Sequence, residues 1–551
     1  MRLARLSVSL LILLGLVASF TQAADSLPMI GTTPTPATIP YIDPAGIAGS
    51  LVISGGGIAT DDVIRARFMQ LGGGKQAKVV IIPTSRSRYE VEQGTVEFET
   101  RYVAPYRAYE PASITVLHTR DTDEANSAEF LKPLREATAV WLMGANQNLH
   151  AAAYLNTKVE AEIYNVLQRG GVVGGTSAGA AIQSRVMIAG GKDEPILATG
   201  LDLLPGAIVD QHFLARKRQG RLLKALAQNP GLWGLGVDEK TAVVVRGRQL
   251  EVIGESAATI LLPPGNGREL REISLRPGDV QDLVSLRRAA LARSVEAYPP
   301  TTWGVPEVKQ GSLVIVGGGG MPADIAKKFV ELAGGADEPI VVLPTAVESP
   351  DLKREGAFLK RMGANNIIVL PQTKRDDVES EAVLEALSKA KGVWFGGGRQ
   401  WRFVDAYLGT KAEALIRDVV ARGGVIGGSS AGATIQGDYL CRGSPLNNTD
   451  MMAEGYERGL ALLQGVAIDQ HFAQRKRFTD MTQLMKFRPQ LLGIGLDEAT
   501  AIVVRGSTAE VLGQSEAHFY DYRASPPQSE KDYTSLKAGQ KFDLLQRKTL
   551  E

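Results

Sequence analysis

The sequence predicts two tandem three-layer α/β/α domains, each built on a mostly parallel β-sheet. Three observations support this fold class. The chain has 551 residues, which is more than one hydrophobic core usually serves. One ordered series of motifs occurs twice along it. Within each copy, short apolar runs rich in β-branched residues alternate with helical stretches, as expected when helices cover both faces of a parallel sheet.

The repeat starts with SLVISGGG at 50–57 and SLVIVGGG at 312–319. Further matched strings are VVIIPTS and IVVLPTA, AVWLMGANQ and GVWFGGGRQ, and GLGVDEKTAVVVRG and GIGLDEATAIVVRG. The distance between matched residues drifts from 262 to 253 and back to 259. The loops therefore differ in length between the copies. The matched polar residues follow apolar runs, and sites in such sheets form at the carboxyl ends of strands.

The first residues are predicted to be a secretory signal peptide. Arg2 and Arg5 precede an apolar run over 6–20, and Thr21-Gln22-Ala23 and Ala24 follow as a cleavage site, where we expect cleavage after Ala23. The run is too short for a comfortable membrane span, although a retained anchor is the alternative. We therefore expect the mature protein to be secreted, either to the periplasm or to the medium, and to have no membrane partner.

The remaining boundaries follow from proline content and from the repeat. The predicted segments are a signal peptide at 1–23, a proline-rich extended arm at 24–45, a first domain at 46–297, a linker at 298–310 and a second domain at 311–551. Inside the first domain, we expect helices at Val159–Arg169 and Phe213–Gln228. The strings VVVRG and QLEVIG predict a hairpin over Val243–Gly254 at one edge of the sheet.

The composition excludes several classes of protein. The chain is 44% hydrophobic and 22% charged, as globular proteins are, and removing 1–23 changes its formal charge from +1 to −1. Nothing in this balance suggests a nucleic-acid partner. One cysteine, Cys441, is consistent with export without a disulfide framework. A single cysteine and five histidines do not form the usual ligand groupings, so we expect no metal and no cofactor.

Each copy contains a Gly-x-Ser-x-Gly turn, at 175–179 and 428–432. An apolar run precedes each turn and a run of small residues follows it, which is the layout of a nucleophile elbow, a tight strand-to-helix turn that exposes a serine hydroxyl. The glycines leave room for the turn and for a close substrate. Ser177 and Ser430 are therefore the predicted nucleophiles of a serine hydrolase present in duplicate.

A serine nucleophile needs a base, and histidine is the usual one near neutral pH. Of the five histidines, only His212 and His471 occupy matched positions, both within Asp-Gln-His-Phe. They lie 35 and 41 residues after the serines, and we assign them as the bases. The alternative is a histidine that only satisfies a backbone group at a strand end.

The base in turn needs an orienting acid. Glu239 and Glu498 lie 27 residues after their histidines in matched strings, and we assign them this role. The adjacent Asp238 and Asp497 match equally well. A carboxylate between serine and histidine is a further alternative, and a plain capping role in a turn is another. The acids in that interval of the first copy include Glu194 and Asp202, and the second copy has none at a matching spacing.

An oxyanion site requires two backbone donors. We expect one from the N–H of Ala178 or Ala431, directly after each serine. The other is expected from the glycine-rich strings at Gly144 and Gly397. The alternative for these strings is an ordinary strand-to-helix turn.

Arginines follow each histidine and suit a clamp for substrate carboxylates, because a guanidinium pairs with a carboxylate through two hydrogen bonds. In a helix starting at Phe213, two of them share a face and a third lies away from it. The alternative is a solvated basic helix face. The predicted substrate-binding residues are Gln147, Asp210, Gln211, Arg216, Arg218 and Arg221 in the first copy and Gln400, Asp469, Gln470, Arg475 and Arg477 in the second.

These strings resemble a known family. GTSAGA, then DQHFLARKRQGRL, then GVDEKTA is similar to the cyanophycinase group of the S51 serine peptidases, which are related to aspartyl dipeptidase. The resemblance covers most of 46–515 and occurs twice. It implies a fold like that of class I glutamine amidotransferases, which is flavodoxin-like, and a Ser-His-Glu triad. It also implies cleavage of cyanophycin, a poly-aspartate with arginine on its β-carboxyls, to β-Asp-Arg dipeptides.

Each copy departs from the family pattern near the site. The first has Ala145 where the family has a second glycine, and the second has Arg399 before its glutamine and Asp480 for the third arginine. We therefore expect the first copy to bind the polymer more as the family does, and the second to have drifted in specificity or lost activity. The duplicated chain would also reproduce a dimer as an intramolecular pseudo-dimer. Two alternatives remain: an S51-type hydrolase of other aspartyl or isoaspartyl peptides, and a polymer-binding scaffold with one or both sites inactive.

Overall fold

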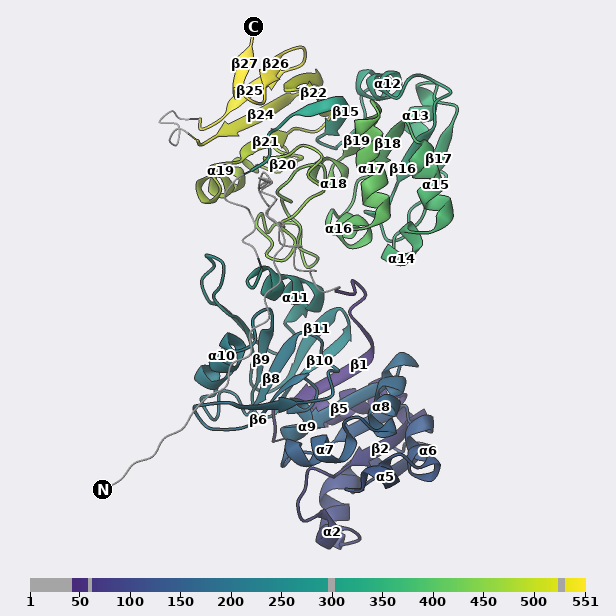
Figure 1. The fold of residues 1–551 in the computed structure, drawn as a ribbon, viewed down its shortest axis with the longest axis vertical. Helices are drawn as coiled ribbons and strands as arrows, with labels where there is room; N and C mark the ends of the chain where they lie inside the picture. Colours follow the sequence, from purple (N-terminus) through teal and green to yellow (C-terminus); the bar gives the residue numbers. More distant parts are fainter. Residues whose placement is uncertain (1–41, 58–61, 296–302, 524–530) are drawn as a thin grey trace, which may run out of the picture. The chain divides into compact units, whose positions relative to one another are not determined.

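The computed structural model describes residues 42–57, 62–295, 303–523 and 531–551 (Figure 1). The predicted signal peptide and most of the predicted arm therefore lie outside the described residues. Within the described ranges, no helix is both long enough and apolar enough to cross a membrane.

The first half contains an eight-stranded sheet in the order β3-β2-β4-β5-β1-β10-β11-β14. Its first five strands are parallel, and β10, β11 and β14 continue the sheet in antiparallel fashion. The strands are β1 (Ile47–Ser54), β2 (Lys78–Ile82), β3 (Ser113–Val116), β4 (Ala139–Leu142), β5 (Val172–Thr176), β10 (Thr241–Gly247), β11 (Gln249–Gly254) and β14 (Val280–Asp282). The mostly parallel sheet is as predicted.

Helices cover both faces of this sheet. Successive residues of the central strands alternate between two hydrophobic clusters: Val52 packs with Phe68 of α1, whereas Leu51 and Ile53 pack with Leu134 and Ile163 on the other face. The helices are α1 (Asp62–Leu71), α2 (Tyr89–Glu92), α3 (Val96–Phe98), α4 (Ala104–Arg107), α5 (Thr122–Ala125), α6 (Ala128–Glu136), α7 (Gln147–Tyr154), α8 (Lys158–Gln168), α9 (Ala178–Ala181), α10 (Gln219–Ala227) and α11 (Leu283–Ala292). The three-layer prediction is confirmed.

A second, smaller sheet carries the strand that leads to the first predicted base. It has the order β13-β12-β9-β8, with β8 and β9 parallel. Its strands are β8 (Ala207–Gln211), β9 (Trp233–Val237), β12 (Ala258–Leu262) and β13 (Arg271–Leu275), and a separate ribbon pairs β6 (Val186–Gly190) with β7 (Ile196–Thr199). A single sheet was predicted for each domain, because apolar runs of similar length do not reveal which sheet they join.

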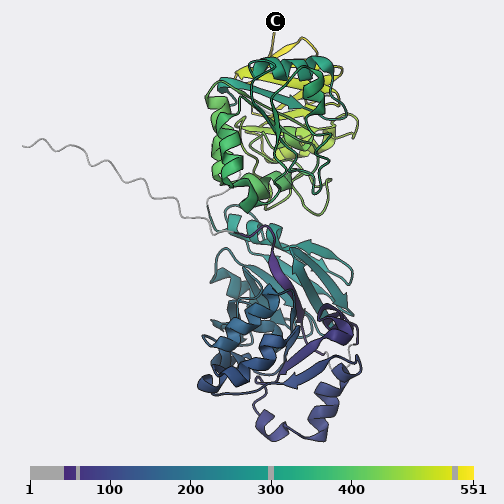
Figure 2. The ribbon, with the colours of Figure 1, turned by 90° about the vertical axis from the view of Figure 1, so that its right-hand side faces the viewer.

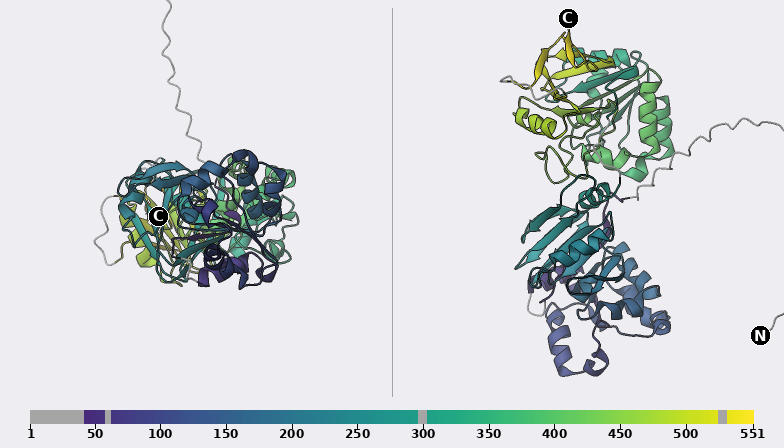
Figure 3. Two further views of the ribbon diagram at one scale, coloured as in Figure 1. Left: turned by 90° about the horizontal axis from the view of Figure 1, so that it is seen from below. Right: turned by 60° about the vertical axis from the view of Figure 1, so that its left-hand side comes forward.

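The second half repeats this plan, with sheets ordered β17-β16-β18-β19-β15-β22-β23-β26-β27 and β20-β21-β24-β25. In Figure 3 its green helices and yellow strands lie on opposite sides of that half. The strands are β15 (Val308–Val316), β16 (Ile340–Leu343), β17 (Ile367–Val369), β18 (Gly392–Phe395), β19 (Val425–Ser429), β20 (Val466–Gln470), β21 (Leu492–Leu496), β22 (Thr500–Gly506), β23 (Thr508–Gly513), β24 (Glu516–Asp521), β25 (Thr534–Lys537), β26 (Lys541–Asp543) and β27 (Lys548–Leu550). The helices are α12 (Ala323–Leu332), α13 (Ala357–Arg361), α14 (Arg375–Val378), α15 (Glu381–Lys389), α16 (Trp401–Tyr407), α17 (Lys411–Ala421), α18 (Ala431–Thr434) and α19 (Phe478–Phe487).

Equivalent aromatic pairs show the common packing of the halves. Phe68 meets Trp141 edge-on at 4.9 Å, and Phe329 meets Trp394 at 5.0 Å. A glycine on the neighbouring strand makes room for each tryptophan, since a Cβ at Gly174 would lie 2.5 Å from Trp141 Cζ3.

Several predicted elements can be compared directly. Helix α8 and the hairpin of β10 and β11 form as predicted, although β14 rather than the hairpin lies at the sheet edge. The helix predicted from Phe213 is wrong at its start: α10 begins at Gln219, and 213–218 is a turn in which Lys217 has φ 52°. Strand β15 begins at Val308, inside the predicted linker.

Candidate active site

The two predicted nucleophiles lie at sharp turns. Strand β5 leads into Ser177, with φ 52° and ψ −108°, and β19 leads into Ser430, with φ 57° and ψ −113°. These angles are rare for a residue with a side chain and are typical of a nucleophile elbow. The flanking glycines are needed sterically, because a Cβ at Gly175 would lie 2.2 Å from the carbonyl oxygen of Gly179.

Each predicted base reaches its serine. The Oγ of Ser177 lies 2.8 Å from Nε2 of His212, and the Oγ of Ser430 lies 2.9 Å from Nε2 of His471. Both histidines have a positive φ, 48° and 50°, at the ends of β8 and β20. With Nε2 unprotonated, the hydroxyl donates to it and the imidazole can take the proton during attack.

The glutamates face the other ring nitrogen. Nδ1 of His212 lies 2.7 Å from Oε1 of Glu239, and Nδ1 of His471 lies 2.6 Å from Oε1 of Glu498. A carboxylate accepting from Nδ1–H fixes the tautomer in which Nε2 is free to act as a base.

The neighbouring aspartate has a different partner. Oδ1 of Asp238 accepts from the backbone N–H groups of Leu214 and Ala215, and its Oδ2 accepts from Ser256. Asp497 holds the equivalent turn through the N–H of Ala473. These aspartates therefore fix the turn that follows each histidine.

The other two alternative acids do not take the place of Glu239, since the ring nitrogens of His212 face Glu239 and Ser177. Glu194 pairs with Lys224, and Asp202 is a half-buried group whose pKa burial raises.

Burial makes both imidazoles easier to keep neutral. The pKa of His212 is lowered from its ordinary 6.5, first by burial and further by the cation of Arg216, while the hydrogen bond to Glu239 opposes the shift. The same balance lowers the pKa of His471, with Arg475 as the nearby cation. Both groups are therefore neutral, and able to accept a proton, at neutral pH.

The predicted oxyanion residues lie beside the serines. A Cβ on Gly144 would lie 3.2 Å from Cβ of Ser177, and a Cβ on Gly397 would lie 3.5 Å from Cβ of Ser430. Ala178 and Ala431 are the first residues of α9 and α18, directly after each serine. Both backbone segments thus approach the serine closely, as an oxyanion site requires.

The predicted substrate-binding glutamines are buried, and three of the four are engaged in side-chain hydrogen bonds. Nε2 of Gln147 donates to the carbonyl of Ile188, and Nε2 of Gln400 donates to the carbonyls of Cys441 and Arg442. Gln211 accepts from Arg218. Gln470 is 4% exposed, and its Oε1 has no hydrogen-bond partner. The side chains of Gln147, Gln211 and Gln400 thus hold the walls of the site together.

The arginine set of the first copy divides into two kinds. Asp210 is fully buried and pairs with Arg221 through both carboxylate oxygens, and Arg218 lies 3.5 Å from it. Burial raises the pKa of Asp210, which is the cost of removing this carboxylate from water. Arg216, by contrast, is exposed on the turn beside His212.

The second copy rebuilds the buried pair from a different segment. Asp469 is fully buried and pairs with Arg477 at 2.7 Å, as Asp210 does with its own arginines. At the position of Arg221 stands Asp480, and Arg442, from the longer 435–465 connection, bridges Asp469 at 3.1 Å and Asp480 at 2.6 Å. The departure at Asp480 is thus compensated, and Arg475 remains exposed like Arg216.

Sequence reasoning missed the glycines that face the imidazoles and the role of Arg442. A Cβ on Gly56 would lie 2.3 Å from Cε1 of His212, and one on Gly318 would lie 2.5 Å from Cε1 of His471. The repeated GGG strings contain the signal for these glycines, because they match in both copies. Arg442 has no counterpart in the first copy, so no internal comparison could reveal it.

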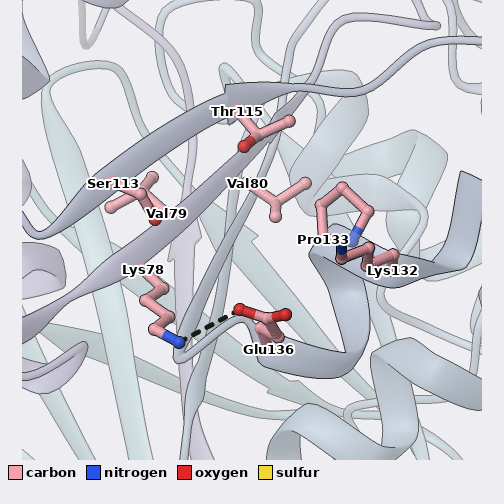
Figure 4. Close-up of a pocket in the computed structure, with 8 residues that line it drawn as sticks. All are labelled: Lys78, Val79, Val80, Ser113, Thr115, Lys132, Pro133 and Glu136. Atoms are coloured by element: carbon pink, nitrogen blue, oxygen red, sulfur yellow. Dashed lines mark hydrogen bonds and ion pairs between the residues drawn. The ribbon is translucent and has the colours of Figure 1, made fainter.

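The first half also contains a cavity that lies away from the predicted nucleophile. It measures about 200 Å³ between β2, β3 and α6 and is bordered by the ion pair of Lys78 and Glu136 (Figure 4). Its eight lining residues contain no histidine or cysteine, and no reactive serine–base pair. Across the described ranges, no group of three or more His, Cys, Asp or Glu could hold a metal ion.

The lowered histidine pKa predicts the acid side of the activity profile. With His212 and His471 as bases, protonation abolishes proton acceptance, so activity should fall as pH drops through the lowered pKa. We expect the acid midpoint of kcat/KM to lie below 6.5 for Ser430→Ala and Ser177→Ala proteins alike. A midpoint above 6.5 in either protein would contradict this assignment.

The position of Arg442 predicts that an arginine at 480 can replace it. Arg442→Ala leaves Asp469 with one arginine fewer and should lower the free energy of unfolding by roughly 3–5 kcal/mol, the usual cost of breaking a buried ion pair. Arg442→Ala combined with Asp480→Arg restores the arrangement of the first copy and should recover much of that loss. Urea unfolding and the rate of Ser430 labelling by a fluorophosphonate measure both effects. A double variant no better than Arg442→Ala would refute the equivalence of Arg442 and Arg221.

Comparisons with known proteins identify a family for both halves. The model of peptidase family S51 matches residues 50–253 and 313–512. A cyanophycinase of Trichormus variabilis is 34% identical over 212 residues, 37% of this chain and 68% of that protein. A cyanophycinase of Geminocystis herdmanii is 35% identical over 228 residues, 39% of this chain and 81% of that protein. The solved structure of a peptidase from an acI-B1 Actinobacterium is 24% identical and covers 42% of this chain and 97% of its own, with a TM-score of 0.33. The chain belongs to peptidase family S51, as two tandem copies of a serine-type peptidase.

Proposed function

We propose that this protein hydrolyses cyanophycin to β-Asp-Arg dipeptides, using Ser177, His212 and Glu239 in the first half and Ser430, His471 and Glu498 in the second. One observation carries the proposal: the same hydrogen-bonded series of serine, imidazole and carboxylate occurs in both halves, with every distance between 2.6 and 2.9 Å. The relatives at about 34% identity are cyanophycinases, which supports the choice of substrate.

The reaction follows from the positions of the groups. The serine Oγ attacks the carbonyl carbon of the scissile amide while its proton passes to Nε2 of the histidine. The glutamate stabilises the imidazolium that forms. In the first half, the N–H groups of Ala178 and of the Gly144 segment would receive the oxyanion. The imidazolium then gives its proton to the leaving amine, and water releases the acyl group by the same steps.

The exposed arginines beside the histidines would hold substrate carboxylates. Arg216 and Arg475 are exposed, whereas Arg218, Arg221 and Arg477 are occupied by the buried aspartates. We therefore assign carboxylate binding to Arg216 and Arg475 and assign the buried arginines to shaping the turn.

Incubation of the protein with cyanophycin tests the proposal. We expect β-Asp-Arg, detected by mass spectrometry, from the unaltered protein and from each of Ser177→Ala and Ser430→Ala. The double variant should lose several orders of magnitude in rate. Unchanged release by the double variant would remove the mechanism. Turnover of β-Asp-X dipeptides with an inert polymer would instead favour a related isoaspartyl peptidase.

Export and a monomeric pseudo-dimer complete the proposal. Arg248 donates to Asp405 at 2.7 Å and Arg293 donates to Glu454 at 2.7 Å, so charged residues of the two sequence copies are paired within one chain. We expect mature protein to begin at Ala24 and to have the native mass of one chain. N-terminal sequencing and native mass spectrometry check these two points, and a retained Met1 would refute cleavage.

A further inference from the structure

The two sites differ in one wall. In each half this wall is formed by the connection that follows the second strand in sequence, β2 or β16. In the first half this connection runs over 83–112 between β2 and β3, and in the second it runs over 344–366 between β16 and β17. The longer connection carries α2, α3, a π-helix at Glu99–Val103 and α4, and its ribbon protrudes from the rest of the first half (Figures 1 and 2).

Both connections pack an aromatic ring against the same tryptophan position. Tyr106 lies 6.1 Å from Trp141, and Phe358 lies 4.9 Å from Trp394, between ring centroids. Shortly before these aromatics, the first connection carries Arg101 and the second carries Glu355, which are charged residues of opposite sign.

The wall of the first site is cationic. A cavity of about 390 Å³ is lined by Ser177, His212 and three arginines, Arg65, Arg86 and Arg101, and its lining includes no carboxylate. Arg86 is held by Glu92 at 2.6 and 2.8 Å, and its guanidinium lies 4.6 Å from the ring of Tyr102. Arg101 is exposed, with its guanidinium 5.3 Å from the same ring.

The second half replaces these cations. Since Phe68 and Phe329 are equivalent, Arg65 corresponds to Ala326, and the strings PTSR and PTAV match Arg86 with Val347. The wall thus loses two of the three arginines outright.

The carboxylate of Glu355 lies near the space that a smaller residue leaves in the second half. Gly396 stands where the first half has Met143, which lines the first cavity. Oε2 of Glu355 lies 4.0 Å from the place of a Cβ on Gly396, next to the oxyanion residue Gly397. Burial, together with the charge of Asp351, raises the pKa of Glu355. A cation bound beside this carboxylate would oppose that shift.

The nearby cations of the second half are directed elsewhere. Arg399 donates to the carbonyls of Ser444 and Asn447, and Arg402 pairs with Glu348 at 2.8 Å. Arg354 pairs with Asp351 on the outer surface, where its side chain is 88% exposed.

We propose that the two sites have opposite charge preferences: the first takes substrates with a carboxylate beside the scissile bond, and the second takes substrates with a guanidinium or ammonium group there. The proposal rests on the hydrolysis proposed above and adds a division of substrates between the copies. A free carboxylate suits Arg101, because Arg65 and Arg86 are paired with Asp62 and Glu92. A cation suits Glu355 in a partly buried place where charge pairing is less screened.

Single-site proteins test the division. Ser430→Ala reports the first site and Ser177→Ala the second. The matched substrates are (β-Asp-Arg)2, a fragment of cyanophycin with two dipeptide units, and its counterpart (β-Asp-Glu)2. We expect the ratio of kcat/KM for the two fragments to differ by at least tenfold, in opposite senses, between the two proteins. Arg101→Gln should reduce the preference of the first site, and Glu355→Gln that of the second. Glu385→Gln, at an exposed helix position paired with Lys389, is the matched control and should change neither ratio.

Equal ratios in the two single-site proteins, or ratios unmoved by Arg101→Gln and Glu355→Gln, would overturn the inference while leaving the proposed hydrolysis intact. Hydrolysis of neither fragment nor the polymer would instead refute the proposed function. In that case, protection of Ser177 and Ser430 from a fluorophosphonate by the two fragments still compares the sites. Equal protection at both serines would then overturn the charge division.

Discussion

The whole site depends on a steric constraint: each imidazole packs so closely against a backbone segment that the residue there must be glycine. Gly56 and Gly318 leave that space, and their positive φ values of 132° and 98° suit glycine alone. With the ring fixed there, Nε2 meets the serine and Nδ1 meets the glutamate. The strained backbone at serine and histidine persists because the strands on either side are buried in the core.

Two sheets rather than one bring the three groups together. The serine follows a strand of the large parallel sheet, whereas the histidine and glutamate follow the parallel strands of the small sheet. A buried aspartate just before each histidine ties the small sheet to the arginines of the next turn. The second copy retains that tie with Arg442 after losing the arginine at position 480. Duplication has therefore preserved an electrostatic requirement while changing the residue that meets it.

The same logic explains which parts of the two copies have diverged. Residues at strand ends are constrained by close contacts, such as those of Gly175 with Gly179 or Gly174 with Trp141. The connection after the second strand keeps an aromatic ring against the same tryptophan in both copies, while its length and charge differ. Arginines in one copy and Glu355 in the other are the result. One chain can in this way carry two sites with one chemistry and different surroundings.

The sequence by itself determined the tandem α/β/α architecture, the family, and the serines and histidines that meet in space, because strand ends and tight turns leave local patterns and the repeat supplies an internal comparison. It did not distinguish Glu239 from Asp238, since adjacent residues at a strand end point in different directions that only the fold sets. It also placed the start of α10 six residues early, because a turn capped by Asp238 resembles a helix start. Tertiary packing decided three further features: the pairing of Arg442 with Asp469, the pairing of Arg221 with Asp210, and the position of Glu355 beside Gly396. Each of these joins segments that have no local pattern in common.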